Sequence, residues 1–576
     1  MRYQPIYDIA EICVRKGISE VVVCPGSRCA PLTLAFTRHP NITVRTFSDE
    51  RSAGFIALGM AQSTDKPVVI VCTSGTAVYN LAPAVAEAYF SHTPLLVITA
   101  DRPAEWIAQH DGQTIYQPEV FGKHVKKYFG LPQDYEHPDS VWAINRIVND
   151  AVNTVIQQPC GPVHINAPFR EPLYPASAES TITYTSDLRV MNQHLPETQL
   201  SPTSKELIAE QWPEFGKVLI VCGQHKADQN LVKSLQTFGN RHQVPIVHDI
   251  ISNLHEVGGT IAHSDLFLGQ VSDQHKEKLQ PDLLITFGHS LISKNLKIFL
   301  RKYPARKHWH IQPQGPVADT FKTVTDVFFA NPAKFIHSLT DLANTGTSSV
   351  ASQAAYASEW RSHEGRVLAA LKNFFAGREH SELSLVERLL NRLPVGARVH
   401  LANSMSVRYA NFIGLIPGAR DIRVFANRGT SGIDGSTSTA IGHTLTSGRP
   451  NFLITGDLAF FYDRNAFWHN YPLENFRVLL LNNHGGLIFD ILEGPSAMPE
   501  AREYFITRQQ LNAQKLCEEF GIQHLKFSEG RNIKEVLDDF FTFDNHAKVL
   551  ELEGDTTSNK AIFETLKLHI KKSYEL

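Results

Sequence analysis

Short runs of β-branched and aliphatic residues recur along the chain, and each run stops at Gly, Ser, Asp or Asn. Residues 21–24, 68–72 and 95–98 are examples, and helix-length amphipathic segments separate them. This alternation is typical of parallel sheets whose strands are joined by crossover helices. It predicts an α/β protein, and it places ligands beyond the carboxyl ends of the strands, where the Gly and Asp residues lie.

The runs fall into three successive sets, which predict three Rossmann-like domains within the 576 residues. The second set starts at residue 217 and the third at residue 399. A polar stretch after Pro175 and the segment 344–349 are the expected linkers. We therefore expect domains at residues 1–180, 195–343 and 355–576.

Composition narrows the possible partners and compartments. The formal net charge is −3, which gives no general attraction to nucleic acid or to an anionic membrane. The seven cysteines form no CxxC pair, so we expect buried, reduced thiols of the kind found in the cytoplasm. The first residues lack the apolar core of a signal peptide, and no run approaches the roughly 20 apolar residues that span a bilayer. We expect a cytoplasmic protein without membrane insertion.

Two apolar runs of the third set stop at oxygen-bearing side chains, one at Gly456-Asp457 and the next at Asn483. The ends of neighbouring parallel strands can converge, so the Asp457 carboxylate, the Asn483 amide oxygen and the Gly485 carbonyl are candidate ligands of one cation. Such an all-oxygen set suits Mg²⁺, or Mn²⁺. Gly456 lets a diphosphate approach the backbone. Taken singly, Gly456-Asp457 or Asn482-Asn483 would more often be an ordinary turn after a strand.

This segment resembles the GDG…NN motif of thiamine diphosphate (ThDP) enzymes, with Leu458 in place of the last Gly. With this departure, the motif resembles that of one branch of the superfamily. The branch is the 2-succinyl-5-enolpyruvyl-6-hydroxy-3-cyclohexene-1-carboxylate (SEPHCHC) synthases, also called MenD. The resemblance covers essentially the whole chain, and it implies pyrimidine-binding, middle and diphosphate-binding domains. It also implies decarboxylation of 2-oxoglutarate and a Stetter-like 1,4-addition to isochorismate in menaquinone biosynthesis.

The resemblance assigns Glu50, at the start of a small-residue helix, to atom N1′ of the cofactor's aminopyrimidine. This pairing favours the imino tautomer, whose N4′ removes the C2 proton. Ile433 matches the bulky residue that wedges between the two cofactor rings. Further expected cofactor contacts are Ser74, Thr76, Ser404, Gly456, Ile488 and Phe489. Without the resemblance, these residues would be interpreted as helix-terminal charges, caps or core side chains.

Both implied substrates are dicarboxylates, so the family's site needs several fixed cations, and Arg suits bidentate binding of carboxylates. The matching positions are Arg28, Arg102, Lys294, Arg408 and Arg428, with Ser404 and Gln113 as polar contacts. Gln113 resembles the family glutamine that contacts the covalent intermediate, although its neighbour Gly112 departs from some relatives. Arg102, between Asp101 and Pro103, equally suits a structural ion pair and turn.

The superfamily builds each active site from two subunits, so the resemblance implies a homodimer or homotetramer with active sites at the subunit interface. One alternative is another ThDP-dependent 2-oxoacid decarboxylase or carboligase. A second is an inactive ThDP-fold subunit, which the intact Glu50, Asp457 and Asn483 disfavour. A third is a nicotinamide-dependent enzyme, which the lack of a convincing GxGxxG fingerprint disfavours.

Overall fold

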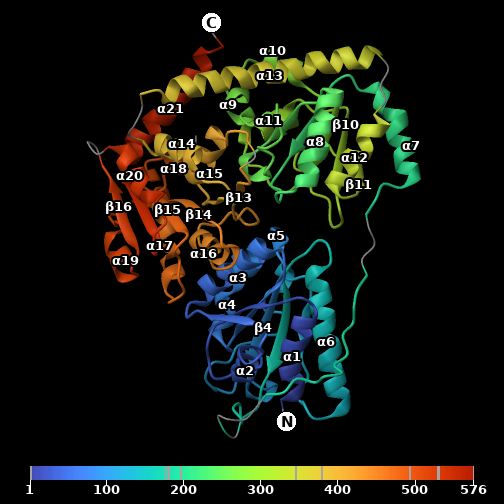
Figure 1. Ribbon diagram of the computed structural model, residues 1–576, viewed down its shortest axis with the longest axis vertical. Coiled ribbons are helices and arrows are strands. Elements are labelled where there is room, and N and C mark those ends of the chain that lie inside the picture. Colours follow the sequence, from blue (N-terminus) through green and yellow to red (C-terminus); the bar gives the residue numbers. More distant parts are fainter. Residues whose placement is uncertain are drawn as a thin grey trace.

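The computed structural model contains three parallel β-sheets with helices on their faces (Figure 1). It describes residues 3–175, 177, 182–194, 198–343, 347–377, 381–418, 420–491, 495–528 and 532–574. The predicted α/β class, with three successive sheets, is confirmed. The domain boundaries stay a prediction.

The first sheet has six strands in the order β2-β1-β3-β4-β6-β5 and lies in the blue and cyan part of Figure 1. Its strands are β1 (Glu20–Val23), β2 (Thr43–Thr46), β3 (Val68–Cys72), β4 (Leu95–Asp101), β5 (Tyr128–Gly130) and β6 (Val163–Pro168). The helices around it are α1 (Gln4–Arg15), α2 (Ala30–Thr37), α3 (Glu50–Thr64), α4 (Thr76–Asn80), α5 (Ala82–Phe90) and α6 (Pro138–Ile156). Strands β3, β4 and β6 are wholly buried because they are covered on both faces. The polar side chains Thr99, His164 and Asn166 of β4 and β6 are hydrogen-bonded to one another.

The second sheet has five strands in the order β11-β10-β9-β7-β8. Its strands are β7 (Val218–Cys222), β8 (Ile246–His248), β9 (Leu283–Phe287), β10 (Lys307–Gln312) and β11 (Asp326–Phe329). Its helices are α7 (Pro202–Gln211), α8 (Gln229–His242), α9 (Ser264–Leu268), α10 (Asp273–Leu279), α11 (Lys294–Lys302) and α12 (Pro332–Leu342). The long helix α13 (Thr347–Phe375) runs along the top of Figure 1, from this part of the molecule to the third.

The third sheet has six strands in the order β13-β12-β14-β15-β17-β16, which repeats the connectivity of the first sheet. Its strands are β12 (Arg398–Leu401), β13 (Arg423–Phe425), β14 (Asn451–Gly456), β15 (Phe476–Asn482), β16 (Gln523–Phe527) and β17 (Lys548–Glu553). Its helices are α14 (Glu382–Arg392), α15 (Met405–Ile413), α16 (Ser436–Ser447), α17 (Asp457–Tyr462), α18 (Leu487–Ile491), α19 (Gln514–Glu519), α20 (Ile533–Phe540) and α21 (Thr556–Lys572).

Helices α3 and α16 cross in close contact and join the first part of the fold to the third. Glycines permit the approach, because a Cβ at Gly59 would lie 2.0 Å from the Thr439 carbonyl oxygen. A Cβ at Gly442 would lie 2.1 Å from the carbonyl oxygen of Ile56. Any side chain at either glycine would force the two backbones apart.

The two helices start at the same end of their contact and finish at the other. Near their first turns, Asp463 accepts a hydrogen bond of 2.7 Å from the Ser438 backbone and lies 4.0 Å from the Arg51 guanidinium. Near their last turns, Gln62 of α3 and His443 of α16 are hydrogen-bonded at 3.3 Å. The amino termini of α3 and α16 therefore lie on one side of the molecule and their carboxyl termini on the other.

The expected second linker is partly wrong. Residues 344–346 lie outside the described residues, and α13 already begins at Thr347. Residues 347–349 are therefore the start of a helix rather than the end of a linker. Of the polar stretch after Pro175, residues 176 and 178–181 lie outside the described residues.

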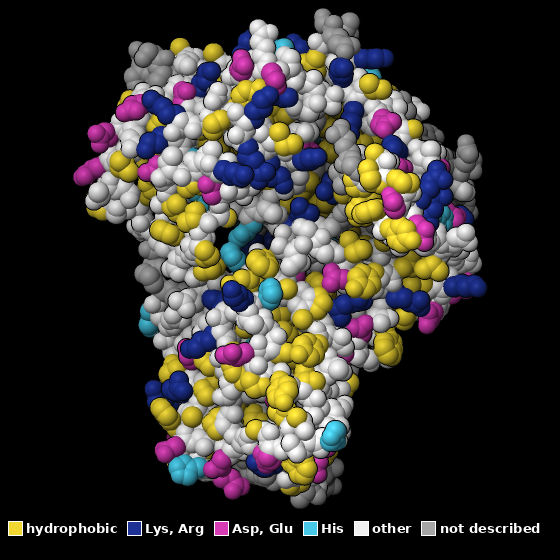
Figure 2. Space-filling model, turned by 180° about the vertical axis from the view of Figure 1, so that it is seen from behind, with side chains coloured by type: hydrophobic (Ala, Val, Ile, Leu, Met, Phe, Trp, Pro, Cys, Tyr) yellow, Lys and Arg dark blue, Asp and Glu magenta, His cyan; other side chains and the backbone are white. Residues whose placement is uncertain are grey.

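Helix length and cysteine burial can be compared with the composition. Among the described residues, every helix is too short or too polar to span a bilayer. All seven cysteines are free, and only Cys160 is not fully buried. Seen from behind, the surface is hollowed where the three parts of the molecule meet, and Lys, Arg and His side chains lie around the hollow (Figure 2).

Candidate active site

The predicted cation ligands lie at the carboxyl ends of two neighbouring strands. Strands β14 and β15 pair in parallel with Gly456 opposite Leu481, so Asp457 and Asn483 follow the paired ends directly. Both side chains are buried, with exposures of 2% and 7%. Gln509 bridges the two ends, because its amide nitrogen donates to Asp457 at 2.6 Å and to Asn482 at 3.1 Å.

The polar atoms of this edge fit a bound cation. The Asn483 amide nitrogen donates to Glu382 at 2.7 Å, while its Oδ1 is buried without a hydrogen-bond partner in the described part of the chain. Burial raises the pKa of Asp457, and hydrogen bonds from Gln509 and the backbone oppose the shift. An ionised buried carboxylate beside an unpartnered amide oxygen is stabilised by a cation. A Cβ at Gly456 would meet nothing within 4 Å, so the approach to the strand end is open.

The cation site is not a cluster of acids and imidazoles. Among the described residues, no group of three or more His, Cys, Asp or Glu side chains is placed to hold a metal ion. Asp457 is the one carboxylate among the predicted ligands, and the others are the Asn483 amide and the Gly485 carbonyl. Gly485 is closely packed, since a Cβ there would lie 2.8 Å from Ile506. A site of this kind needs further oxygens, which a diphosphate and water would supply.

Glu382 was missed by the sequence analysis. It is the first residue of α14, its side chain is 1% exposed, and burial raises its pKa to about 7. Its contact with Asn483 turns the amide so that the oxygen faces away from Glu382. No local pattern marks it, because the two residues are 101 positions apart.

Glu50 lies at the edge of the first sheet, as the first residue of α3. The side chain of Asp49 caps the helix by accepting hydrogen bonds from the Arg51 and Ser52 backbone nitrogens. The Glu50 carboxylate is partly exposed and accepts one hydrogen bond of 3.3 Å from Asn80. One carboxylate oxygen is therefore presented without a described protein donor.

Ser74, Thr76 and Gln113 lie at this same edge. Ser74 is buried, and its hydroxyl has no hydrogen-bond partner among the described atoms. Gly75, between Ser74 and Thr76, has a φ of +87°, and a Cβ there would lie 3.2 Å from the Gln113 backbone. The Gly75 nitrogen donates to Gln117 at 3.0 Å, a contact that the sequence analysis also missed.

The two cations of the first sheet are already held by protein groups. Arg28 is buried, donates to the Phe169 carbonyl at 2.9 Å and lies 3.7 Å from Glu171. Arg102 donates to the Gly112 carbonyl at 2.8 Å and lies 3.1 Å from Asp111. Arg102 therefore fixes the loop that carries Gln113, in the manner of the structural ion pair that its sequence context allowed.

Arg408 and Arg428 differ, because neither has a carboxylate within 4.0 Å among the described residues. Arg408 donates to the Ser404 carbonyl at 2.5 Å, and Arg428 donates to the Asn403 amide oxygen at 2.8 Å. Burial lowers the pKa of both guanidiniums, and the charge of Arg428 lowers that of Arg408 further. Ser404 has a φ of +73°, a strained conformation that turns its carbonyl to this contact.

Lys294 is brought towards these arginines by the second sheet. It is exposed and begins α11, and the residue before it, Ser293, donates its backbone N–H to Asp249 at 3.1 Å. Asn411 of α15 donates to the same Asp249 at 3.3 Å, and α15 also carries Arg408. The start of α11 and helix α15 are thus fixed to one buried acid.

The apolar candidates lie beside the third sheet. Ile433 is partly buried in the loop that precedes α16, and Glu87 of α5 holds this loop by accepting hydrogen bonds from Gly429 and Thr430. Ile488 and Phe489 lie on α18, the helix that follows the Asn483 turn, and both are partly buried. The structure therefore places all three next to the elements that carry the other candidates.

Helix α17 lies between the two edges within one chain. Arg51, next to Glu50, donates to the carbonyl of Tyr462 at 2.8 Å, at the end of this helix. Asp457 lies at its other end. The structure thus groups Glu50, Ser74, Thr76, Gln113, Arg28 and Arg102 on the first sheet, and groups the remaining candidates on the second and third.

The fold and this site agree with comparisons to known families. A model of the N-terminal TPP-binding domain of thiamine pyrophosphate enzymes matches residues 7–120, and a model of the middle domain of such enzymes matches residues 187–400. Thiamine pyrophosphate is another name for ThDP. At the carboxyl ends of their strands, the three sheets carry polar groups that have no described hydrogen-bond partner. Together with these two matches, they define a ThDP-dependent enzyme.

The chain belongs to the family of 2-succinyl-5-enolpyruvyl-6-hydroxy-3-cyclohexene-1-carboxylate (SEPHCHC) synthases. A relative of that name from Cytophaga hutchinsonii is 43% identical, over 99% of this chain and 100% of the relative. Those from Flavobacterium johnsoniae and Phocaeicola vulgatus are 36% and 34% identical, each over 96% of both chains. The family predicted from Leu458 and the cation pattern is confirmed.

Proposed function

We propose that this chain makes SEPHCHC from 2-oxoglutarate and isochorismate in menaquinone biosynthesis. 2-Oxoglutarate loses CO₂, and its remaining four-carbon unit adds to isochorismate by a 1,4-addition that consumes one proton. The observation that carries this proposal is the pair of partly buried guanidiniums, Arg408 and Arg428, that lack carboxylate partners among the described residues. Dicarboxylate substrates supply those partners.

The residues of the third sheet suit the cofactor's diphosphate and a divalent metal, Mg²⁺ or Mn²⁺. Asp457, Asn483 and the Gly485 carbonyl would hold the metal, which would supply positive charge beside the diphosphate. Support comes from the unpartnered Asn483 oxygen and from the raised pKa of Asp457. Further proposed cofactor contacts are Ser404, Gly456, Ile488 and Phe489.

Glu50 acts on the protonation of the aminopyrimidine ring of the cofactor. ThDP, when bound, supplies the carbon nucleophile of the reaction. Glu50 would hold a proton at N1′, Ser74 and Thr76 would contact the same ring, and Ile433 would pack against the cofactor. The free oxygen of the Glu50 carboxylate supports this role.

The cations bind and orient the two substrates. Arg408, Arg428 and Lys294 neutralise substrate carboxylates, Ser404 lies beside them, and Arg28 and Arg102 act from the first sheet with Gln113. The proposal includes a homodimer or homotetramer in the cytoplasm, in which the first-sheet edge of one subunit completes the third-sheet edge of its partner.

The proposal is tested by an isochorismate consumption assay with purified protein, ThDP and Mg²⁺. Addition of 2-oxoglutarate should abolish the ultraviolet absorbance of the isochorismate diene, and omission of 2-oxoglutarate should leave it unchanged. Turnover of pyruvate without consumption of isochorismate would reject the substrate assignment and leave the cofactor assignment standing.

A further inference from the structure

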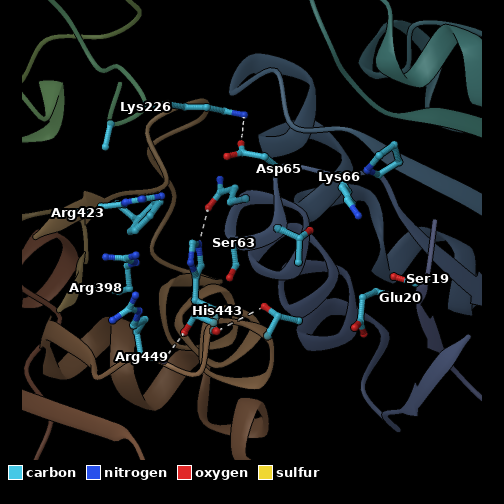
Figure 3. Close-up of a pocket in the computed structure, with 17 residues that line it drawn as sticks. Ser19, Glu20, Ser63, Asp65, Lys66, Lys226, Arg398, Arg423, His443 and Arg449 are labelled. Carbon is cyan, nitrogen blue, oxygen red and sulfur yellow. Dashed lines mark hydrogen bonds and ion pairs between the residues drawn. The ribbon is translucent and has the colours of Figure 1, made fainter. Parts of the chain in front are cut away.

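A cavity of about 340 Å³ lies on the opposite side of α3 and α16 from the candidate active site. The last turns of both helices line it, together with the first residues of β12 and β13 from the third sheet (Figure 3). Five cations from all three parts of the fold line this basic cavity, namely Lys66, Lys226, Arg398, Arg423 and Arg449.

Positive charge is crowded on one wall of the basic cavity. Arg398 and Arg423 stand opposite each other on neighbouring strands. A single acid serves both, since Asp421 lies 3.6 Å from Arg398 and 3.3 Å from Arg423. Arg398 is 8% exposed, and burial lowers its pKa, as do the nearby charges of Arg423 and Arg449. Like charges placed opposite each other on neighbouring strands are destabilising unless a counter-charge joins them.

Two of the five cations have no counter-charge among the described residues. Lys226 is paired with Asp65 at 2.5 Å. Arg449 and Lys66 are exposed, and neither has a carboxylate within 4.0 Å in the part of the chain that is described. Arg449 instead lies over Gly396, where an added Cβ would be 3.2 Å from its Nη1.

Helix termini account for some of these cations but not for all. Lys66 follows the carboxyl end of α3, and Arg449 follows that of α16, where positive charge is favourable. Arg398 and Arg423 begin strands of a sheet, whose net dipole is small. Arg398 donates to the Gly396 and Asp421 carbonyls at 3.0 Å, so the fold already uses it, whereas Arg423 has Asp421 as its one partner among the described residues.

We propose that the basic cavity binds a small organic anion that carries phosphate or more than one carboxylate. Arg423, Arg449 and Lys66 carry side-chain N–H groups without an acceptor among the described residues, and such groups bind oxyanions. The volume is at the lower end of the roughly 300–1,000 Å³ of small-molecule sites. The Phe425 ring supplies an apolar wall. The site is separate from the active site, because Arg398 and Arg423 begin β12 and β13, whereas the candidate ligands follow the carboxyl ends of strands. Helix α3 also places Glu50 about 20 Å away.

The test is a calorimetric titration of the holoenzyme, with saturating ThDP and Mg²⁺ to fill the diphosphate site. Inorganic phosphate and succinate are the two probes, and they distinguish the phosphate from the dicarboxylate form of the ligand. We expect at least one probe to bind, and the double variant Lys66→Gln/Arg449→Gln to raise its Kd at least tenfold. Both positions are exposed, so the variant should fold.

Two control variants separate this site from its alternatives. Arg464→Gln removes a surface arginine paired with Glu519, outside the cavity lining, and should leave the Kd unchanged. Arg408→Met should also leave it unchanged, because succinate bound at the active site would respond to that change instead. The proposal is overturned if neither probe binds at millimolar concentration. It is also overturned if the double variant lowers Tm while its Kd equals that of the wild type, since the cations then serve only the helix ends.

Discussion

The first and third sheets share one strand connectivity, yet the arginines at their carboxyl edges differ in the carboxylate partners that the protein supplies. At the first edge, Arg28 and Arg102 have carbonyl and carboxylate partners within the chain. At the third edge, Arg408 and Arg428 have no carboxylate partner among the described residues, and the Asn483 oxygen has no donor. A shared topology fixes where a ligand sits, whereas unsatisfied polar groups determine which ligand it is.

The largest expected effect belongs to Glu50, a first-edge acid with one carboxylate oxygen that no described protein group bonds. Glu50→Gln should slow hydrogen–deuterium exchange at C2 of bound ThDP by about 10²- to 10⁴-fold, because the amide cannot hold the N1′ proton as an acid does. Rapid-quench NMR of the cofactor measures this rate. Glu105→Gln, at an exposed acid paired with Arg170, is the matched control. An exchange rate equal to that of the wild type would remove Glu50 from the role.

Asp457→Asn tests whether the third edge is built to receive a cation. We expect ThDP affinity in the presence of Mg²⁺ to fall more than about 100-fold, beyond the 10- to 100-fold of typical outer ligand partners. Calorimetry of ThDP binding measures it. Retention of affinity would show that the metal is held elsewhere.

In the cofactor-free chain, where no ligand is bound, Asp457→Asn should raise the free energy of unfolding. Burial raises the folded-state pKa of Asp457 above its unfolded value, so the ionised carboxylate costs stability, and this cost grows as pH rises through the folded pKa. Asp457→Asn should therefore be at least as stable as the wild type at pH 8, and its advantage should vanish near pH 4. Thermal unfolding of both proteins across this range measures the difference. A variant less stable at pH 8 would contradict the account.

Glu382→Gln tests the residue that orients the Asn483 amide. Loss of the carboxylate weakens the contact at 2.7 Å and allows the amide to turn its nitrogen towards the metal. We expect Mg²⁺ affinity in the ThDP complex to fall roughly 10- to 100-fold. Glu387→Gln, on the same helix and bonded to Asn391, is the control and should change nothing. Equal Mg²⁺ affinity in both variants would show that Glu382 does not orient the Asn483 amide for the metal.

Glu382 also marks where sequence reasoning stops. The central strands were predictable because wholly buried parallel strands are continuous apolar runs, as in residues 68–72. The edge strands β5, β11, β13 and β16 were not predicted, since short strands with one covered side carry polar residues such as those of Arg423–Phe425. The candidate ligands lie in local motifs, whereas Glu382 and Gln509 reach them from 101 and 52 positions away.

The smallest expected effects come from a pair of arginines, one at each edge. Arg408→Met removes a guanidinium without a described carboxylate partner, so substrate loses a charge-assisted contact, and we expect kcat/KM for 2-oxoglutarate to fall about tenfold. Arg102→Met removes one already bonded to Gly112 and Asp111, and the fall should be about threefold or less. Steady-state kinetics with isochorismate consumption as the readout measure both. If Arg102→Met lowers kcat/KM more than Arg408→Met does, Arg102 binds substrate as well as holding its own loop. The contrast between the two edges would then be wrong.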